Sequence, residues 1–234
     1  MQRIPALEAP FSAEAEPVLA SMMPPGVAPI ALFRTFARNL PMTSAMRGWG
    51  GYELSGNLSL TMRDREIVID RTCARCGCEY EWGVHVAFFA DRVGITPAQL
   101  RSLTNGTPGD ACWIEPRETL LIEAVDSLHD SSDIPDDLWT RLTAVFDQPQ
   151  LVDLVMLTGW YHAISFAARA LRVEPEAGTP RFADVSGAGS AVHHNIEVSQ
   201  RNADRRARPV PDRRGAGVNQ LGRPCEPGRT PLAP

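Results

Sequence analysis

Three cysteines, a histidine and two glutamates lie close together in the sequence between residues 73 and 85. Cys73, Cys76 and Cys78 are followed by Glu81 and His85. On a helix, positions 78, 81 and 85 share one face. Glu81 and His85, four residues apart, are also close enough to share a hydrogen bond. These residue types can form a thiol redox centre, an acid–base site or a metal site.

The position of Cys78 favours thiol chemistry. Cys78 stands at the expected start of a helix, where unpaired backbone N–H groups and the helix dipole favour an anion, so we expect a lowered thiol pKa. Glu66 belongs to the preceding helix, which an antiparallel turn at Gly77 would place alongside. The alternative is a surface Glu–His contact worth a few tenths of a kcal/mol and a cysteine that merely fills space. Polar groups at a seam between apolar helices are costly unless they are used, which favours a functional site.

The spacing of apolar residues predicts an all-α fold. Thr61 and Thr96 are expected helix caps, Gly77 and Gly94 are expected breaks, and no alternating strand pattern of any length is present. The expected helices cover residues 13–22, 30–38, 42–56, 61–71, 78–94, 95–106, 115–130, 135–147 and 149–173.

Composition divides the chain at residue 185. Residues 1–184 are expected to form one domain, whereas residues 185–234 are rich in Arg, Pro and Gly and are expected to be disordered. The tail carries a net charge of +4. Because the whole chain carries −5, residues 1–184 carry −9. A domain this acidic is a poor nucleic-acid binder. All 23 basic residues are arginine, which excludes Schiff-base chemistry on a lysine side chain.

The first twenty residues contain acids and prolines and do not resemble a signal peptide. We also expect no apolar segment of the roughly 18–20 residues that a membrane span needs. The sequence therefore predicts a cytoplasmic protein without a membrane partner, in a compartment where thiols stay reduced. Its five cysteines do not form the pattern of a secreted disulfide framework.

The stretch around Cys78 resembles the carboxymuconolactone decarboxylase and AhpD-like alkylhydroperoxidase superfamily. Peroxidase members carry a Glu, then Cys-x-x-Cys, then a His, and Glu66, Cys78 and His85 match three of these four positions in register. The segments "DRVGITPAQLRSL" and "LTGWYHAISFAARALRV" add to the resemblance, which spans roughly residues 3 to 184. It implies an AhpD-like helical bundle, a homo-oligomer (trimer or hexamer) and no cofactor.

The chain departs from the peroxidase pattern at Glu81, which stands where the family has its peroxide-reactive cysteine. In a thiol peroxidase of this type, Cys78 would attack a hydroperoxide, Cys76 or Cys73 would resolve the product, Glu66 and His85 would relay protons, and a thiol reductant would restore the enzyme. Such an activity is antioxidant.

Two further functions remain open. The decarboxylase members also place a Glu four residues before the His, so Glu81 and His85 can instead be the acid and base of a cofactor-independent decarboxylase or isomerase acting on carboxylated lactones. The chain can also be a binding relative without catalysis.

Metal binding is the weaker interpretation of the same residues. "C-x-x-C-x-C" followed by His85 offers thiolate and imidazole ligands, but zinc knuckles draw a second ligand pair from a separate hairpin, so we expect no metal. His162 is expected to be a core histidine, with a place at the pocket as the alternative, and His129 is expected to end a helix. His193 and His194 are expected to be solvated side chains of the tail.

Overall fold

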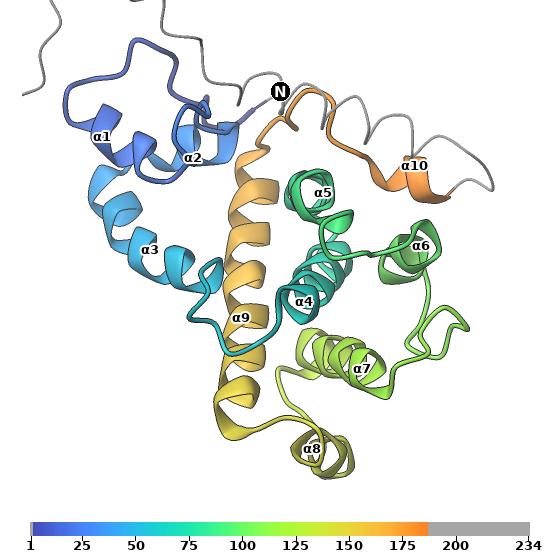
Figure 1. Cartoon of the computed structure of the whole chain (residues 1–234). Coiled ribbons are helices and arrows are strands. Elements are labelled where there is room, and N and C mark those ends of the chain that lie inside the picture. The colour runs from blue at the N-terminus through green and yellow to red at the C-terminus, as the bar shows by residue number, and fades with distance from the viewer. Residues whose placement is uncertain (1, 187–234) are drawn as a thin grey trace, which may run out of the picture.

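The computed structural model describes residues 2–186 and confirms the all-α fold, with no strand among those residues. The elements are α1 (Ala15–Ala20), α2 (Ala31–Phe36), α3 (Leu40–Glu53), α4 (Met62–Arg75), α5 (Glu79–His85), the π-helix η1 (Val86–Ala90), α6 (Pro97–Asn105), α7 (Pro116–Ser131), α8 (Asp136–Thr143), α9 (Gln148–Leu171) and α10 (Phe182–Ser186). The long α9 runs through the molecule, with α1, α2 and α3 on one side and α4 to α7 on the other (Figure 1).

Helix α4 is the centre of the core. It packs against α5, α6, α7 and α9, and every residue from 64 to 73 is buried. Thr61 caps the helix as expected, because its side chain accepts a hydrogen bond from the backbone N–H of Asp64, whose carboxylate accepts one in return. The helix continues past the expected end at residue 71 to Arg75.

Three arginines of α4 pair with acidic residues of α7 at a constant offset. Arg63 pairs with Glu118 at 2.5 Å, and Arg71 holds Asp126 through two hydrogen bonds of 2.7 Å. Arg75 pairs with Asp130. The partners advance together along both helices, so α4 and α7 run parallel and end at the same side of the molecule.

The helix expected over residues 78–94 is split in two. The α-helical part, α5, ends at His85, and the π-helix η1 carries the chain to Ala90. Such π segments are rare and frequently occur at functional sites. Gly94 adopts φ +66°, which confirms the expected break in the left-handed region that glycine favours.

Two expectations need correction: that no segment is long and apolar enough to span a membrane, and that the tail begins at residue 185. By length and composition α9 qualifies as a membrane span, with an 18-residue window of mean hydropathy 1.3, so the expectation that no segment reaches this length is wrong. Half of that window is buried inside the protein, as in an ordinary core helix. Val185 and Ser186, assigned to the tail, belong to α10. The rest of the predicted tail, with His193 and His194, lies outside the described residues.

Candidate functional site

The turn between α4 and α5 brings the expected site residues to one seam. Gly77 adopts φ +63°, and the N–H of Cys78 donates to the carbonyl of Cys73 at 2.8 Å. The chain reverses here, so α5 lies antiparallel to α4 as expected, and Cys78 is the residue that precedes α5. Further from the turn, the same pairing places His85 of α5 opposite Glu66 of α4.

Glu66 and His85 form a buried hydrogen-bonded pair. His85 Nδ1 lies 2.8 Å from Glu66 Oε2, and Arg65 Nε donates to Glu66 Oε1 at 2.7 Å. The other ring nitrogen of His85, Nε2, lies 3.0 Å from the Tyr161 hydroxyl and 3.6 Å from Glu81 Oε1. The structure therefore places Glu66, Glu81 and His85 together, and α9 contributes Tyr161 to the same group.

The two carboxylates favour a positive charge on His85. Burial disfavours the imidazolium, but Glu66 and then Glu81 outweigh it and raise the pKa of His85 to about 10. At neutral pH the ring therefore carries both protons. In this state His85 can donate a proton to a leaving group, but it must first lose one before it can act as a base.

The environment of Cys78 overturns the expected lowering of its thiol pKa. Cys78 is fully buried. Burial raises its pKa to about 11, although the backbone N–H of Glu81 acts in the opposite direction. The Glu81 carboxylate raises it further. The start of the short α5 is therefore too weak a source of positive potential to offset desolvation.

Cys73, Cys76 and Cys78 gather around the hydroxyl of Ser165 on α9. Ser165 Oγ lies 3.9 Å from Cys73 Sγ, and the same hydroxyl lowers the pKa of all three thiols against the larger effect of burial. The charge of a Cys78 thiolate also raises the pKa of Cys73, and that of a Cys76 thiolate raises the pKa of Cys78, so the three thiols influence one another electrostatically. Cys78 makes no hydrogen bond with His85; Glu81 stands between them in sequence and contacts His85.

Two buried carboxylates of α4 and α5 keep oxygens without a hydrogen-bond partner among residues 2–186, as does Glu53 on α3. On α4 and α5 these are both oxygens of Asp70, one turn beyond Glu66, and Oε2 of Glu81. Burial, reinforced by the charge of Glu66, raises the pKa of Asp70 well above its ordinary value. Such groups destabilise a fold unless a proton or a bound molecule satisfies them.

Sequence reasoning missed four of the residues at this seam: Arg65, Asp70, Tyr161 and Ser165. Tyr161 and Ser165 are four residues apart in the sequence, and this helical spacing was the available signal. His162 does not reach the seam. It is half-buried, its Nδ1 donates to the Thr158 carbonyl at 2.8 Å, and its Nε2 lies 3.0 Å from His129 Nδ1.

The structure does not group the three cysteines with His85 as metal ligands. Among the described residues, the set with suitable ligand atoms is Cys76, His129 and His162, all within 4.8 Å of one another. His129 lies in the last turn of α7, as expected for this residue.

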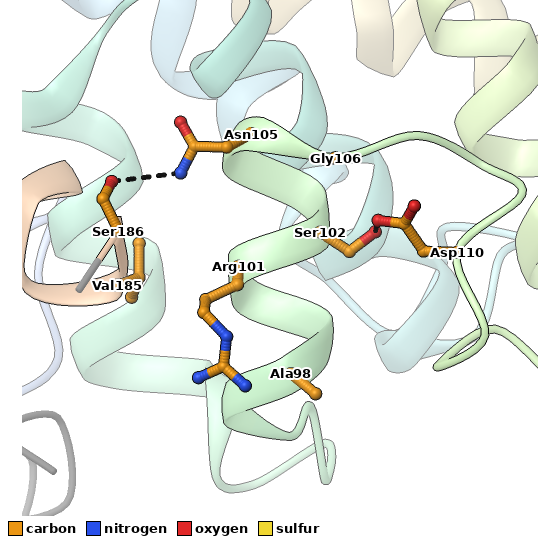
Figure 2. A pocket seen from close by; sticks show the side chains of 8 residues that line it. All are labelled: Ala98, Arg101, Ser102, Asn105, Gly106, Asp110, Val185 and Ser186. Atoms are coloured by element: carbon orange, nitrogen blue, oxygen red, sulfur yellow. Dashed lines mark hydrogen bonds between the residues drawn. The ribbon is translucent and has the colours of Figure 1, made fainter. Parts of the chain in front are cut away.

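A surface pocket of about 570 Å³ lies elsewhere, between α6 and α10 (Figure 2). Two pairs of its polar side chains are hydrogen-bonded, because Ser102 donates to Asp110 at 2.7 Å and Asn105 donates to Ser186 at 3.1 Å, whereas Arg101 is exposed. It contains no cysteine or histidine. We therefore place the candidate site at the buried α4–α5 seam and not in this pocket.

Comparison with known proteins supports the fold. The chain is similar to an uncharacterised peroxidase-related protein from Silicibacter sp. TM1040, with a TM-score of 0.64, 17% identity, and coverage of 77% of this chain and 97% of that one. It is also similar to the debrominase Bmp8, with a TM-score of 0.59, 14% identity, and coverage of 74% and 92%. No family model and no curated protein matches the chain. At these identities the two neighbours show a shared helical fold and leave the reaction open.

Proposed function

We propose that this chain is a thiol-dependent oxidoreductase that reduces small hydroperoxides through Cys78. The observation that carries the proposal is the convergence of three thiols around Ser165, at the same helix seam as the Glu66–His85–Tyr161 network. The fold shared with a peroxidase-related protein supports it. The residues involved are buried, so the proposed substrate is small and enters when the seam opens locally.

In the proposed reaction Cys78 attacks one oxygen of the hydroperoxide. The O–O bond breaks, Cys78 becomes a sulfenic acid, and the leaving alkoxide or hydroxide takes a proton that His85 supplies. Glu66 holds the His85 ring and stabilises its protonated form. Glu81, whose free Oε2 is buried three residues beyond Cys78, accepts the thiol proton.

Cys73 is the proposed resolving residue. Its thiol attacks the sulfenic sulfur, which forms a Cys73–Cys78 disulfide and releases water. An external thiol reductant then returns two electrons and two protons. We prefer Cys73 to Cys76 because Cys76 is directed toward His129, with its Sγ 3.9 Å from His129 Nδ1.

The test is a thiol count and disulfide map before and after addition of hydrogen peroxide or tert-butyl hydroperoxide. The expected result is the loss of two thiols and a Cys73–Cys78 disulfide by mass spectrometry. Cys73→Ser should leave a sulfenic acid on Cys78 that a dimedone probe traps, and Cys112→Ser should behave as the unchanged chain. An unaltered thiol count with no sulfenic acid on Cys78 would remove the proposal.

Rates measured at several pH values can separate the effect of Glu81 on the pKa of Cys78 from its proposed role as the proton acceptor. A thiol of pKa about 11 carries about 100-fold less thiolate at neutral pH than one of pKa 9. Alkylation of Cys78 should therefore accelerate about tenfold per pH unit up to this value. Glu81→Gln removes a charge that raises the pKa, so it should speed alkylation at neutral pH but slow peroxide reduction. Parallel changes in both rates would contradict the assigned role of Glu81.

A second candidate function is the lyase or isomerase reaction on carboxylated lactones, in which Glu81 and His85 act as base and acid. The contact of 3.6 Å between Glu81 Oε1 and His85 Nε2 favours it. In that case Cys78→Ser should keep turnover nearly intact, and Glu81→Gln should abolish it. If neither activity is found, the third alternative, a binding protein without catalysis, is favoured.

A further inference from the structure

A second cluster of chemically active side chains lies where α4, α7 and α9 meet, outside the Glu66–His85 seam. Cys76 follows the last turn of α4, His129 lies in the last turn of α7, and His162 lies in the middle of α9. His129 Nδ1 is 3.0 Å from His162 Nε2 and 3.9 Å from Cys76 Sγ. We propose that these three side chains bind a zinc ion.

The spacing of the three ligand atoms fits a tetrahedral zinc ion. Zinc binds imidazole nitrogen at about 2.0–2.1 Å and thiolate sulfur at about 2.3 Å, so tetrahedral angles place two nitrogens about 3.3 Å apart and a nitrogen and a sulfur about 3.6 Å apart. Two of the observed separations, 3.0 and 3.9 Å, differ from these by a few tenths of an ångström. The third, between Cys76 and His162, is within 4.8 Å, so the Cys76 side chain has to rotate toward the two histidines to admit the ion.

A hydrogen bond to the backbone already orients His162. His162 Nδ1 donates its proton to the carbonyl of Thr158 at 2.8 Å, which leaves the lone pair of Nε2 directed at the cluster. Hydrogen bonds from the non-ligating nitrogen to a carbonyl commonly fix the tautomer and orientation of metal-bound histidines. Without an ion, His129 Nδ1 donates to this lone pair; with zinc bound, His129 keeps its proton on Nε2 instead.

The surroundings of the cluster suit a cation that comes from solvent. The parallel helices α4 and α7 both end here, and helix C-termini favour positive charge. Arg75 and Arg169 oppose a cation, whereas Asp126 and Asp130 are paired with Arg75 and offset its charge. Both histidines are half-buried, so an ion has a path to the buried Cys76.

The chemistry of the donors selects the metal. One thiolate and two imidazoles form a mixed sulfur and nitrogen set that suits zinc, whereas magnesium and calcium require oxygen ligands. The described residues supply three ligands, which leaves the fourth position to water or an added ligand. This proposal does not depend on the proposed peroxidase activity, because neither Cys73 nor Cys78 takes part.

The test uses the full chain carrying His193→Gln and His194→Gln, so that the adjacent histidines of the tail do not bind zinc. Titration with Zn²⁺ against a competing chelator should give one site per chain. Cys76→Ser and His129→Asn should weaken binding by more than the about 10–100-fold that loss of a second-shell hydrogen bond costs. Cys112→Ser, at a half-buried cysteine, is the matched control and should bind normally.

Cobalt supplies a spectroscopic readout that starts from the unaltered chain. Co²⁺ added to the unaltered chain should give a thiolate-to-cobalt charge-transfer band, and Zn²⁺ should displace it. Cys76→Ser should lose the band and Cys112→Ser should keep it. A folded chain that binds neither ion, or that binds both equally well after Cys76→Ser, would overturn the proposal.

Discussion

At the scale of single residues, the burial of the Asp70 carboxyl is unfavourable for the stability of the fold. Its carboxyl is buried on α4 beside the Glu66–His85 pair, and neither oxygen finds a partner among the described residues. Burial and the nearby charge of Glu66 keep its pKa high, so this side chain must hold a proton or impose a buried charge. Natural proteins retain such groups mainly where function uses them.

Replacing Asp70 with Asn should therefore stabilise the protein at neutral pH by on the order of 1–3 kcal/mol. Because the pKa of Asp70 is higher in the folded state than in the unfolded state, Asp70 destabilises the fold at a pH above its unfolded pKa of about 4. The stabilisation by Asp70→Asn should therefore shrink as the pH falls toward about 4. Denaturant unfolding at several pH values measures this. The pKa of Asp110 is lowered by Ser102 and Thr107, so Asp110→Asn should act with the opposite sign. A less stable Asp70→Asn variant at neutral pH would mean that the carboxylate has a partner the static structure does not reveal.

The sequence was sufficient to predict that Glu66, Glu81 and His85 lie together, because their spacing along two helices fixes which faces they share. It was not sufficient for the pKa of Cys78 or for the charge of His85. Both depend on burial and on residues such as Tyr161 and Ser165, which lie 76 and 92 positions from the side chains they contact. Local patterns carry no information about partners at that distance.

At the scale of elements, the sequence predicts where helices form, but it does not predict which helices pack together. Caps at Thr61 and Thr96 and breaks at Gly77 and Gly94 are local signals, and the structure confirms them. The sequence did not predict the burial of the highly charged α4, because three of its arginines pair with acids of α7 that lie 55 residues away in the sequence. The end of α5 at His85 was missed for a similar reason, since the apolar residues of η1 continue the helical pattern.

Gly83 shows how tightly α5 is held. A Cβ at this position would lie 2.6 Å from the backbone carbonyl oxygen of Pro180, in the segment that leads to α10. Gly83→Ala should therefore destabilise the fold by about 1–3 kcal/mol, because a backbone atom has to move. Gly48 on α3 is the matched control: its Cβ would meet nothing within 4 Å, so Gly48→Ala should stabilise the helix by up to about 1 kcal/mol. Thermal unfolding compares the two, and equal effects would argue against the close packing of α5 on residues 179–180.

At the scale of the whole molecule, α9 presents an apolar face to solvent along much of its length. Val152, Met156 and Phe166 are 62%, 43% and 63% exposed, and Val155 lies beside them on the helix. Small residues continue the same face at Gly159 and Ala163, as helical spacing requires. A contiguous apolar face of this kind typically marks an interaction surface, whereas isolated exposed apolar residues do not. A second copy of the chain is the partner that the family resemblance implies.

We therefore expect a homo-oligomer in which α9 faces another protomer. Light scattering coupled to size-exclusion chromatography should give a mass that is a multiple of 25.6 kDa. Val152→Asp combined with Phe166→Asp should shift this mass toward the monomer, because each carboxylate would be desolvated in the interface. Ile114 is 81% exposed but lies in the loop before α7, away from this face, so Ile114→Asp should leave the mass unchanged. A monomer before any substitution would refute the expected assembly, and an oligomer that resists the double substitution would place the interface on another face.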